Sequence, residues 1–258
     1  MNYIGIDIGS TCAKTVVLNE KKEIIQEFVQ PTGWSSVDTA EEIHQKLELA
    51  GINLSDDSSC CVATGYGRIS VPYADKTVTE ITCHALGAVH LFQQPDLTVI
   101  DIGGQDTKII QIEQGFVKDF IMNDKCAAGT GRFLEVMANT LSLRPNEMFD
   151  LARLGSDTTI SSMCTVFAES EIIGLIGKGE PKENIAYAVV NSTIRKVAAQ
   201  VSRINGEMST FCLTGGLCEC EYIREALSKE LGKEVISCPD ARYAGAIGAA
   251  LSAMKVRR

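Results

Sequence analysis

Two short segments of the chain combine an aspartate, glycines and hydrogen-bond donors in a pattern typical of phosphate binding. The first segment comprises Asp7, Ile8, Gly9, Ser10, Thr11, Cys12, Ala13 and Lys14. Its glycine lets the backbone approach an anion, its two hydroxyls are further donors, and Lys14 can neutralise negative charge. Asp7, at the end of an apolar stretch, can hold a hydrated Mg²⁺ ion. We therefore predict that this first turn binds the phosphates of a nucleotide.

The second segment repeats these components and comprises Asp101, Ile102, Gly103, Gly104, Gln105 and Asp106. Because Gln105 can orient a water molecule, we predict Asp7, Asp101 and Gln105 as the catalytic residues. A third glycine turn follows Thr214, and the further predicted nucleotide-binding residues are Thr130, Gly215, Gly216 and Arg242. Each turn alone is also compatible with an ordinary hairpin whose aspartate caps a backbone group. Their repetition favours phosphate binding.

Other nucleotide-binding patterns are absent from the sequence. It contains no GxxxxGK[ST] segment, which excludes a P-loop protein. No GxGxxG segment connects the first expected strand to a helix, which excludes a dinucleotide site of that kind.

The chain has ten cysteines but none of the usual zinc-binding spacings. Cys126 and Cys164 each precede a helical pattern, where the helix dipole favours the metal-binding thiolate, although either can also be a small buried apolar residue. We expect six others to fill the core, namely Cys12, Cys60, Cys61, Cys83, Cys212 and Cys238. The roles of Cys218 and Cys220 stay open, as do the adenosine contacts beyond Gly215 and Gly216.

Composition sets limits on partners and location. The 258 residues carry a net charge of −9, so a general affinity for nucleic acid is not expected. No apolar run approaches the roughly 20 residues that cross a bilayer, and the first residues lack the features of a signal peptide. We expect a cytoplasmic protein without a membrane partner.

Strands and helices alternate along the chain in a way that places each turn at the end of a strand. Expected strands cover 3–9, 14–18, 23–29, 61–67, 97–104, 108–112, 116–122 and 211–213. Expected helices cover 36–49, 79–91, 131–141, 167–176, 183–204, 222–231 and 244–254. The apolar–Asp–apolar–Gly theme of residues 6–9 recurs at 100–103, which indicates an internal duplication.

This α/β arrangement resembles the superfamily of actin, sugar kinases and heat-shock chaperone ATPases. The resemblance implies two ribonuclease-H-like lobes with a nucleotide cleft between them. We expect the first lobe at residues 1–94, completed by a C-terminal helix at about 244–258. The second lobe is expected at residues 95–243 and carries Cys126 and Cys164.

Five stretches carry a more specific resemblance: GIDIGST, TGYGR, DIGGQD, NDKCAAGTGRFLEVMA and CTVFAESE. In this order they resemble the ATP-dependent activators of 2-hydroxyacyl-CoA dehydratases, relatives of the ATPase subunits of benzoyl-CoA reductase. The resemblance implies one four-iron, four-sulfur cluster shared across a homodimer, held by Cys126 and Cys164 of each chain. Four thiolates per cubane agree with two per chain on a two-fold axis.

The function implied is an oxygen-sensitive ATPase that hydrolyses ATP, with Mg²⁺, to inject a low-potential electron into a partner enzyme. The expected partners are a cluster-containing dehydratase or reductase component and, as donor, reduced ferredoxin or flavodoxin. Alternatives are an activator of a benzoyl-CoA reductase or of a double-cubane cluster protein. A small-molecule kinase of the same superfamily and a non-enzymatic filament or chaperone-like switch are further alternatives, and neither would contain iron.

Overall fold

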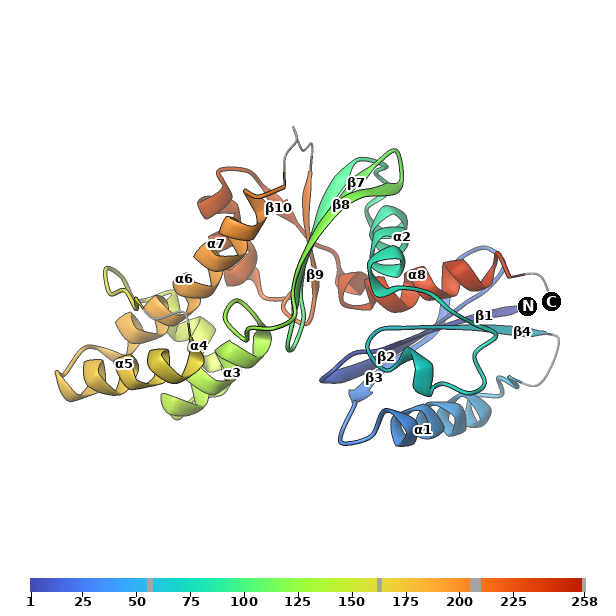
Figure 1. Ribbon diagram of the computed structural model, residues 1–258, viewed down its shortest axis with the longest axis horizontal. Coiled ribbons are helices and arrows are strands. Elements are labelled where there is room, and N and C mark those ends of the chain that lie inside the picture. The colour runs from blue at the N-terminus through green and yellow to red at the C-terminus, as the bar shows by residue number, and fades with distance from the viewer. Residues whose placement is uncertain (55–57, 162–163, 205–209, 257–258) are drawn as a thin grey trace. The chain divides into compact units, whose positions relative to one another are not determined.

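The computed structural model describes residues 1–54, 58–161, 164–204 and 210–256 (Figure 1). The chain forms two compact units. The first unit contains Met1–Val99, Ile110–Asp119 and Cys238–Arg258, and the second contains Ile100–Ile109 and Phe120–Ser237. Residues 257 and 258, the end of the predicted C-terminal helix segment, lie outside the described residues.

The first sheet has five strands in the order β3-β2-β1-β4-β5. Their bounds are β1 Asn2–Ile8, β2 Cys12–Leu18, β3 Ile24–Pro31, β4 Ser59–Thr64 and β5 Lys76–Thr77. Strands β1, β2 and β3 form an antiparallel meander, whereas β4 runs parallel to β1 and β5 runs parallel to β4. This arrangement puts the end of β1, with Asp7, next to the end of β4, with Thr64.

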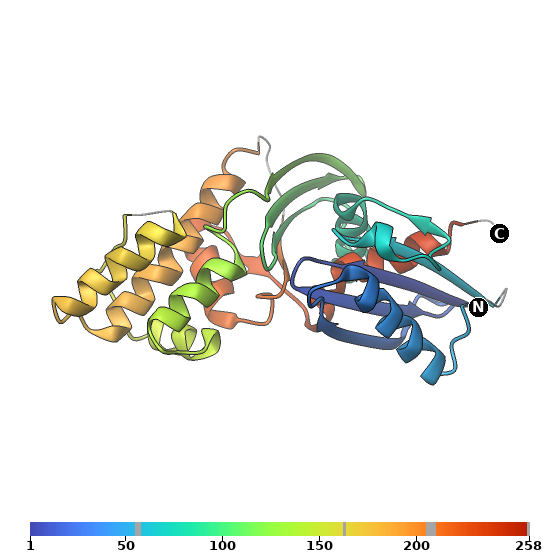
Figure 2. The same cartoon turned by 60° about the horizontal axis from the view of Figure 1, so that its bottom comes forward.

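Helices cover both faces of the first sheet (Figures 1 and 2). Helix α1 (Ser36–Leu49) packs through Ala40, Ile43 and Leu47 on the isoleucines of β1 that alternate along one face. Helix α8 (Ala244–Ala253) packs on the other face beside α2 (Glu80–Phe92). A Cβ on Gly5 would collide with the carbonyl of Ala246, so glycine is required for α8 to lie this close.

The second sheet repeats the topology of the first. It contains β6 (Leu97–Ile102), β7 (Thr107–Glu113), β8 (Phe116–Asn123), β9 (Phe211–Gly215) and β10 (Val235–Ile236). Its order is β10-β9-β6-β7-β8, and β10 is parallel to β9. With β6 matched to β1, the order is the same as in the first sheet. This agreement confirms the predicted internal duplication.

The described part of the second unit contains the helices α3 (Gly131–Thr140), α4 (Pro145–Ala152), α5 (Thr165–Gly177), α6 (Lys182–Val201) and α7 (Glu221–Leu231). Helix α4 was not predicted, because its eight residues are too few to show a clear helical period. Its signals were Pro145 at the first position and Glu147, whose carboxylate accepts from the Arg144 backbone amide at 2.7 Å. The short β5 and β10 and the 3₁₀ turns Arg68–Ser70 and Pro239–Tyr243 were also missed. No helix in the described part of the chain is long and apolar enough to cross a membrane.

Candidate functional site

The first aspartate–glycine turn connects β1 to β2, and Thr32, the residue after β3, holds it by a hydrogen bond. The Gly9 amide donates to the Cys12 carbonyl at 3.1 Å, and the Thr32 hydroxyl donates to the Gly9 carbonyl at 2.7 Å. The turn residues Ser10, Thr11 and Cys12 are exposed, Ala13 is buried and Lys14 is half-buried. The expectation that Cys12 fills the core is therefore wrong, because it stands at the exposed start of β2.

Asp7 is only 4% exposed and lies in a cradle made by two glycines. A Cβ on Gly65, whose φ is +83°, would collide with Oδ1 of Asp7, and a Cβ on Gly245 would stand 2.5 Å from Oδ2. Glycine is therefore required at both positions for the Asp7 carboxylate to fit here. A carboxylate held in this way suits the outer coordination of a hydrated Mg²⁺ ion.

A histidine that the sequence analysis did not select faces Asp7. His84 is buried, and its Nε2 lies 3.9 Å from Oδ2 of Asp7 and 3.8 Å from Oε1 of Glu80. Glu80 and His84 are one helical turn apart on α2, so both project to the same side of that helix. Spacing along the helix gave a signal for the pair, but their approach to Asp7 depends on how α2 packs.

Arg242, predicted to bind nucleotide, lies in the 3₁₀ turn Pro239–Tyr243 of the first unit. Burial raises the pKa of Glu27, Asp240 raises it further, and the positive charge of Arg242 lowers it. Arg242 therefore acts electrostatically on β3 in this structure.

The second turn, between β6 and β7, is built around a buried lysine. The Gly103 amide donates to the Asp106 carbonyl at 2.9 Å. Lys108 is 1% exposed, and its Nζ lies 3.2 Å from Oδ2 of Asp101 and 2.8 Å from Oδ2 of Asp106. Lys108 was missed as a site residue, although it follows Asp101 by the same seven positions that separate Lys14 from Asp7.

The third glycine turn adjoins this second turn. The Thr214 hydroxyl donates to Oδ1 of Asp101 at 2.8 Å. Gly215 has a φ of +85°, and a Cβ there would stand 2.5 Å from the carbonyl oxygen of Ile102. A Cβ on Gly216 would meet no heavy atom within 4 Å among the described residues. The Gln105 side chain is exposed. Predicted residues of two distant segments therefore meet in the second unit.

Three hydrogen bonds connect the second turn to the segment that carries Cys126. The Gly131 amide donates to the Gly103 carbonyl at 3.0 Å, and the Arg132 amide donates to the Gly104 carbonyl at 2.7 Å. The Thr107 hydroxyl donates to the Gly129 carbonyl at 2.6 Å. The start of α3 thus rests on the turn itself.

Within that segment, Thr130 and Asn123 close the loop before α3. Thr130 is buried, and its hydroxyl donates to the Ala127 carbonyl at 2.6 Å. The Asn123 side-chain amide donates to the carbonyls of Cys126 and Ala128. The predicted nucleotide residue Thr130 therefore shapes the cysteine loop in this structure.

Cys126 and Cys164 are both exposed thiols of the second unit. Cys164 caps the N-terminus of α5, whereas Cys126 precedes α3 by five residues.

The prediction that the other cysteines fill the core is confirmed for Cys60, Cys61, Cys83 and Cys212, while Cys238 is only half-buried. Burial raises the pKa of the Cys83 thiol to about 12, and it also raises the pKa values of Cys220 and Cys238. These three thiols are poorer sources of thiolate for a metal.

Among the residues that the structure describes, no three His, Cys, Asp or Glu side chains converge as a metal site.

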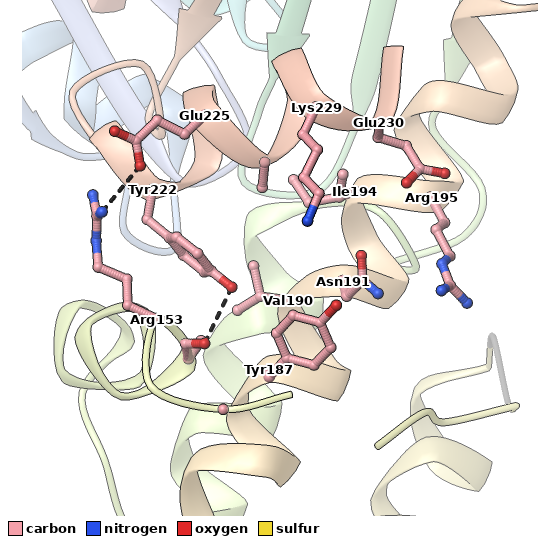
Figure 3. A pocket seen from close by; sticks show the side chains of 13 residues that line it. Arg153, Tyr187, Val190, Asn191, Ile194, Arg195, Tyr222, Glu225, Lys229 and Glu230 are labelled. Carbon is pink, nitrogen blue, oxygen red and sulfur yellow. Dashed lines mark hydrogen bonds and ion pairs between the residues drawn. The ribbon is translucent and has the colours of Figure 1, made fainter. Parts of the chain in front are cut away.

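A cavity of about 540 Å³ opens between the end of α4, α6 and α7 in the second unit (Figure 3). Tyr187 and Asn191 face Tyr222 across it, and at its edge Arg153 forms ion pairs with Glu221 and Glu225. None of the predicted site residues lines this cavity.

Comparison with known proteins identifies similar chains. The model of the BadF/BadG/BcrA/BcrD ATPase family matches residues 4–253. The (R)-2-hydroxyglutaryl-CoA dehydratase activating ATPase of Acidaminococcus fermentans is 44% identical over 98% of this chain and 96% of its own. The structure of the activator of the 2-hydroxyisocaproyl-CoA dehydratase from Clostridium difficile, with bound ADPNP, aligns with a TM-score of 0.89 and 34% identity over 100% and 99% of the two chains. A ROK family glucokinase from Streptomyces griseus shares only the fold, with a TM-score of 0.62 and 16% identity over 99% and 100% of the two chains. The predicted actin-like α/β fold is confirmed.

Proposed function

The chain belongs to the BadF/BadG/BcrA/BcrD ATPase family, and on that premise we propose that it is an ATP-dependent activator that donates a low-potential electron to a partner enzyme. The observation that carries the proposal is similarity along the whole chain to two activators of 2-hydroxyacyl-CoA dehydratases. The first proposed partner is accordingly such a dehydratase. A benzoyl-CoA reductase or a double-cubane cluster protein is the alternative, and neighbouring genes would discriminate between them.

In this proposal the two turns bind MgATP and activate water. Lys14, the hydroxyls of Ser10 and Thr11, and the backbone of the first turn contact phosphate groups. Asp7, in its glycine cradle, holds the hydrated Mg²⁺ ion, and Gln105 orients the attacking water beside Asp101. The third turn, at Gly215 and Gly216, receives the nucleoside. A bound ADPNP in a relative of 34% identity supports a nucleotide site in this fold.

The proposed redox group is one four-iron, four-sulfur cluster shared by two chains. Cys126 and Cys164 are the donor set, because both are exposed thiols of one unit. Each chain supplies two thiolates and a cubane needs four, so two copies complete the site. When bound, the cluster supplies one-electron chemistry, with reduced ferredoxin or flavodoxin as the proposed donor. The location proposed for these reactions is the cytoplasm.

An apolar helix next to Cys164 supports the homodimer. Helix α5 begins at the residue after Cys164 and exposes Val166, Phe167, Ile173 and Ile176, while only Ala168 and Ile172 of the described helix are buried. A surface helix with apolar side chains on several sides is expected to be covered by a partner. A second copy of this helix, beside a shared cluster, is the proposed cover.

The cluster assignment is tested with single cysteine variants purified without oxygen. We expect Cys126→Ser and Cys164→Ser to lose iron, sulfide and visible absorbance and to form a weaker dimer, because each removes two of four ligands per dimer. Cys238→Ser is the matched control and should keep the cluster. Air should bleach the wild-type protein. Four irons per dimer in either ligand variant would contradict the assignment, and a wild type without iron would favour a small-molecule kinase.

A further inference from the structure

The two turns carry the same Asp and Lys at the same spacing, but the lysines have different surroundings. In the first turn, Lys14 stands opposite Asp7 across β1 and β2 and is half-buried. Within the described ranges it forms no ion pair. In the second turn, Lys108 is almost completely buried and contacts two carboxylates. One lysine is available to a ligand and the other is committed to the protein.

The contacts of Lys108 fix the shape of the second turn. Its Nζ joins Asp101, on β6, to Asp106, at the start of β7, at 3.2 and 2.8 Å. The second oxygen of Asp106 occupies the space where a Cβ of Gly103 would stand. The second oxygen of Asp101 accepts from Thr214, next to Gly215. A single ammonium group therefore sets the orientation of both carboxylates and the backbone between them.

We propose that Lys108 is a positioning residue for ATP hydrolysis, which holds Asp101 and Asp106 while its counterpart Lys14 is left for the phosphates. The inference depends on the proposed nucleotide site. Stability alone does not require this arrangement, because an apolar side chain of similar size often replaces a buried ion cluster without loss. What an apolar side chain cannot do is orient two carboxylates. The cluster also keeps one net negative charge, which favours a cation at the turn.

The experiment separates positioning from stability with a charge-matched variant. Lys108→Met leaves the buried carboxylate of Asp101 and the half-buried carboxylate of Asp106 without this cation, so we expect a lower melting temperature. The double variant Lys108→Met with Asp106→Asn has the same net charge as the wild-type cluster and should regain most of the stability. In the double variant Lys108 no longer orients Asp101, so we expect kcat to stay roughly 10- to 100-fold below wild type although the melting temperature recovers. Lys14→Met should show the opposite pattern, with weaker binding of a fluorescent ATP analogue and an unchanged melting temperature.

Lys118→Met is the matched control, because Lys118 forms an exposed ion pair with Glu113, and it should leave both the melting temperature and kcat unchanged. A double variant that turns over ATP like wild type would overturn the proposal, since the cation would then be dispensable. So would a double variant as unstable as Lys108→Met, because charge balance would then not explain the cluster. Failure of the wild type to bind the ATP analogue would instead refute the nucleotide site itself.

Discussion

At the scale of single residues, Asp7 and Asp101 occupy equivalent places in two copies of one motif but have different neighbours. Asp7 lies between two glycines and faces His84 at 3.9 Å. Asp101 is held by Lys108 and Thr214 at 3.2 and 2.8 Å. Because the Lys108 ammonium already offsets part of the charge of Asp101, we propose Asp7 as the metal-organising group.

We predict that Asp7→Asn lowers ATP turnover by about 100-fold, the scale expected when a metal-organising group is removed. The amide keeps the shape of the side chain but loses the charge that attracts hydrated Mg²⁺. Phosphate release at saturating MgATP measures the effect, and iron content should stay at the wild-type value. Asp38→Asn, at an exposed position of α1, is the control. If Asp7→Asn and Asp101→Asn both keep wild-type turnover, the proposed cleft is excluded.

At the scale of elements, local patterns predicted most helices and strands but not the contacts between them. Helix α1 was predicted at its observed bounds, 36–49. In the structure Ser35 caps it and its buried residues recur on one side. The repeated Asp–Gly theme correctly indicated two copies of one sheet. The approach of His84 to Asp7 joins residues far apart in sequence and depends on the packing of α2 beside α8, which no local spacing encodes. Comparison of the two copies could have selected Lys108 as a site residue but not predicted its burial, because its counterpart Lys14 is half-buried.

The bond from Thr107 to Gly129 gives a prediction about α3 and the cysteine loop. We expect Thr107→Val to reduce the effect of an ATP analogue on hydrogen exchange of residues 123–131, because the valine cannot donate to the Gly129 carbonyl. Thr107→Ser retains the hydroxyl and should keep the effect. Thr193→Val is the matched control, since the buried Thr193 hydroxyl has no hydrogen-bond partner in the described structure. An undiminished nucleotide effect in Thr107→Val would contradict a role for this bond.

At the scale of the whole molecule, the two units with the same strand order carry different parts of the proposed machinery. The first unit contributes the exposed turn that precedes Lys14, and the second contributes the turn with Lys108 and the two proposed cluster ligands, Cys126 and Cys164. In the second unit one hydrogen bond joins Thr107 to Gly129 in the loop of Cys126, and two join the turn to the first residues of α3, Gly131 and Arg132. A change in the shape of the turn can therefore be transmitted through these hydrogen bonds to Cys126, one proposed cluster ligand in each chain. The proposed homodimer would contain two such connections.

The last prediction is that nucleotide changes the exposure of the cluster. An electron donated at low potential is useful only if it is released toward the partner enzyme when ATP is present, so we expect a chelator to remove iron faster with a non-hydrolysable ATP analogue than with ADP or without nucleotide. The rate of absorbance loss under anaerobic conditions measures this difference. Thermodynamic reciprocity then requires that a docked partner which selects the more open arrangement raises the affinity for ATP by the same factor. Equal rates of iron removal in all three states would show that the two sites act independently, even if each one is real.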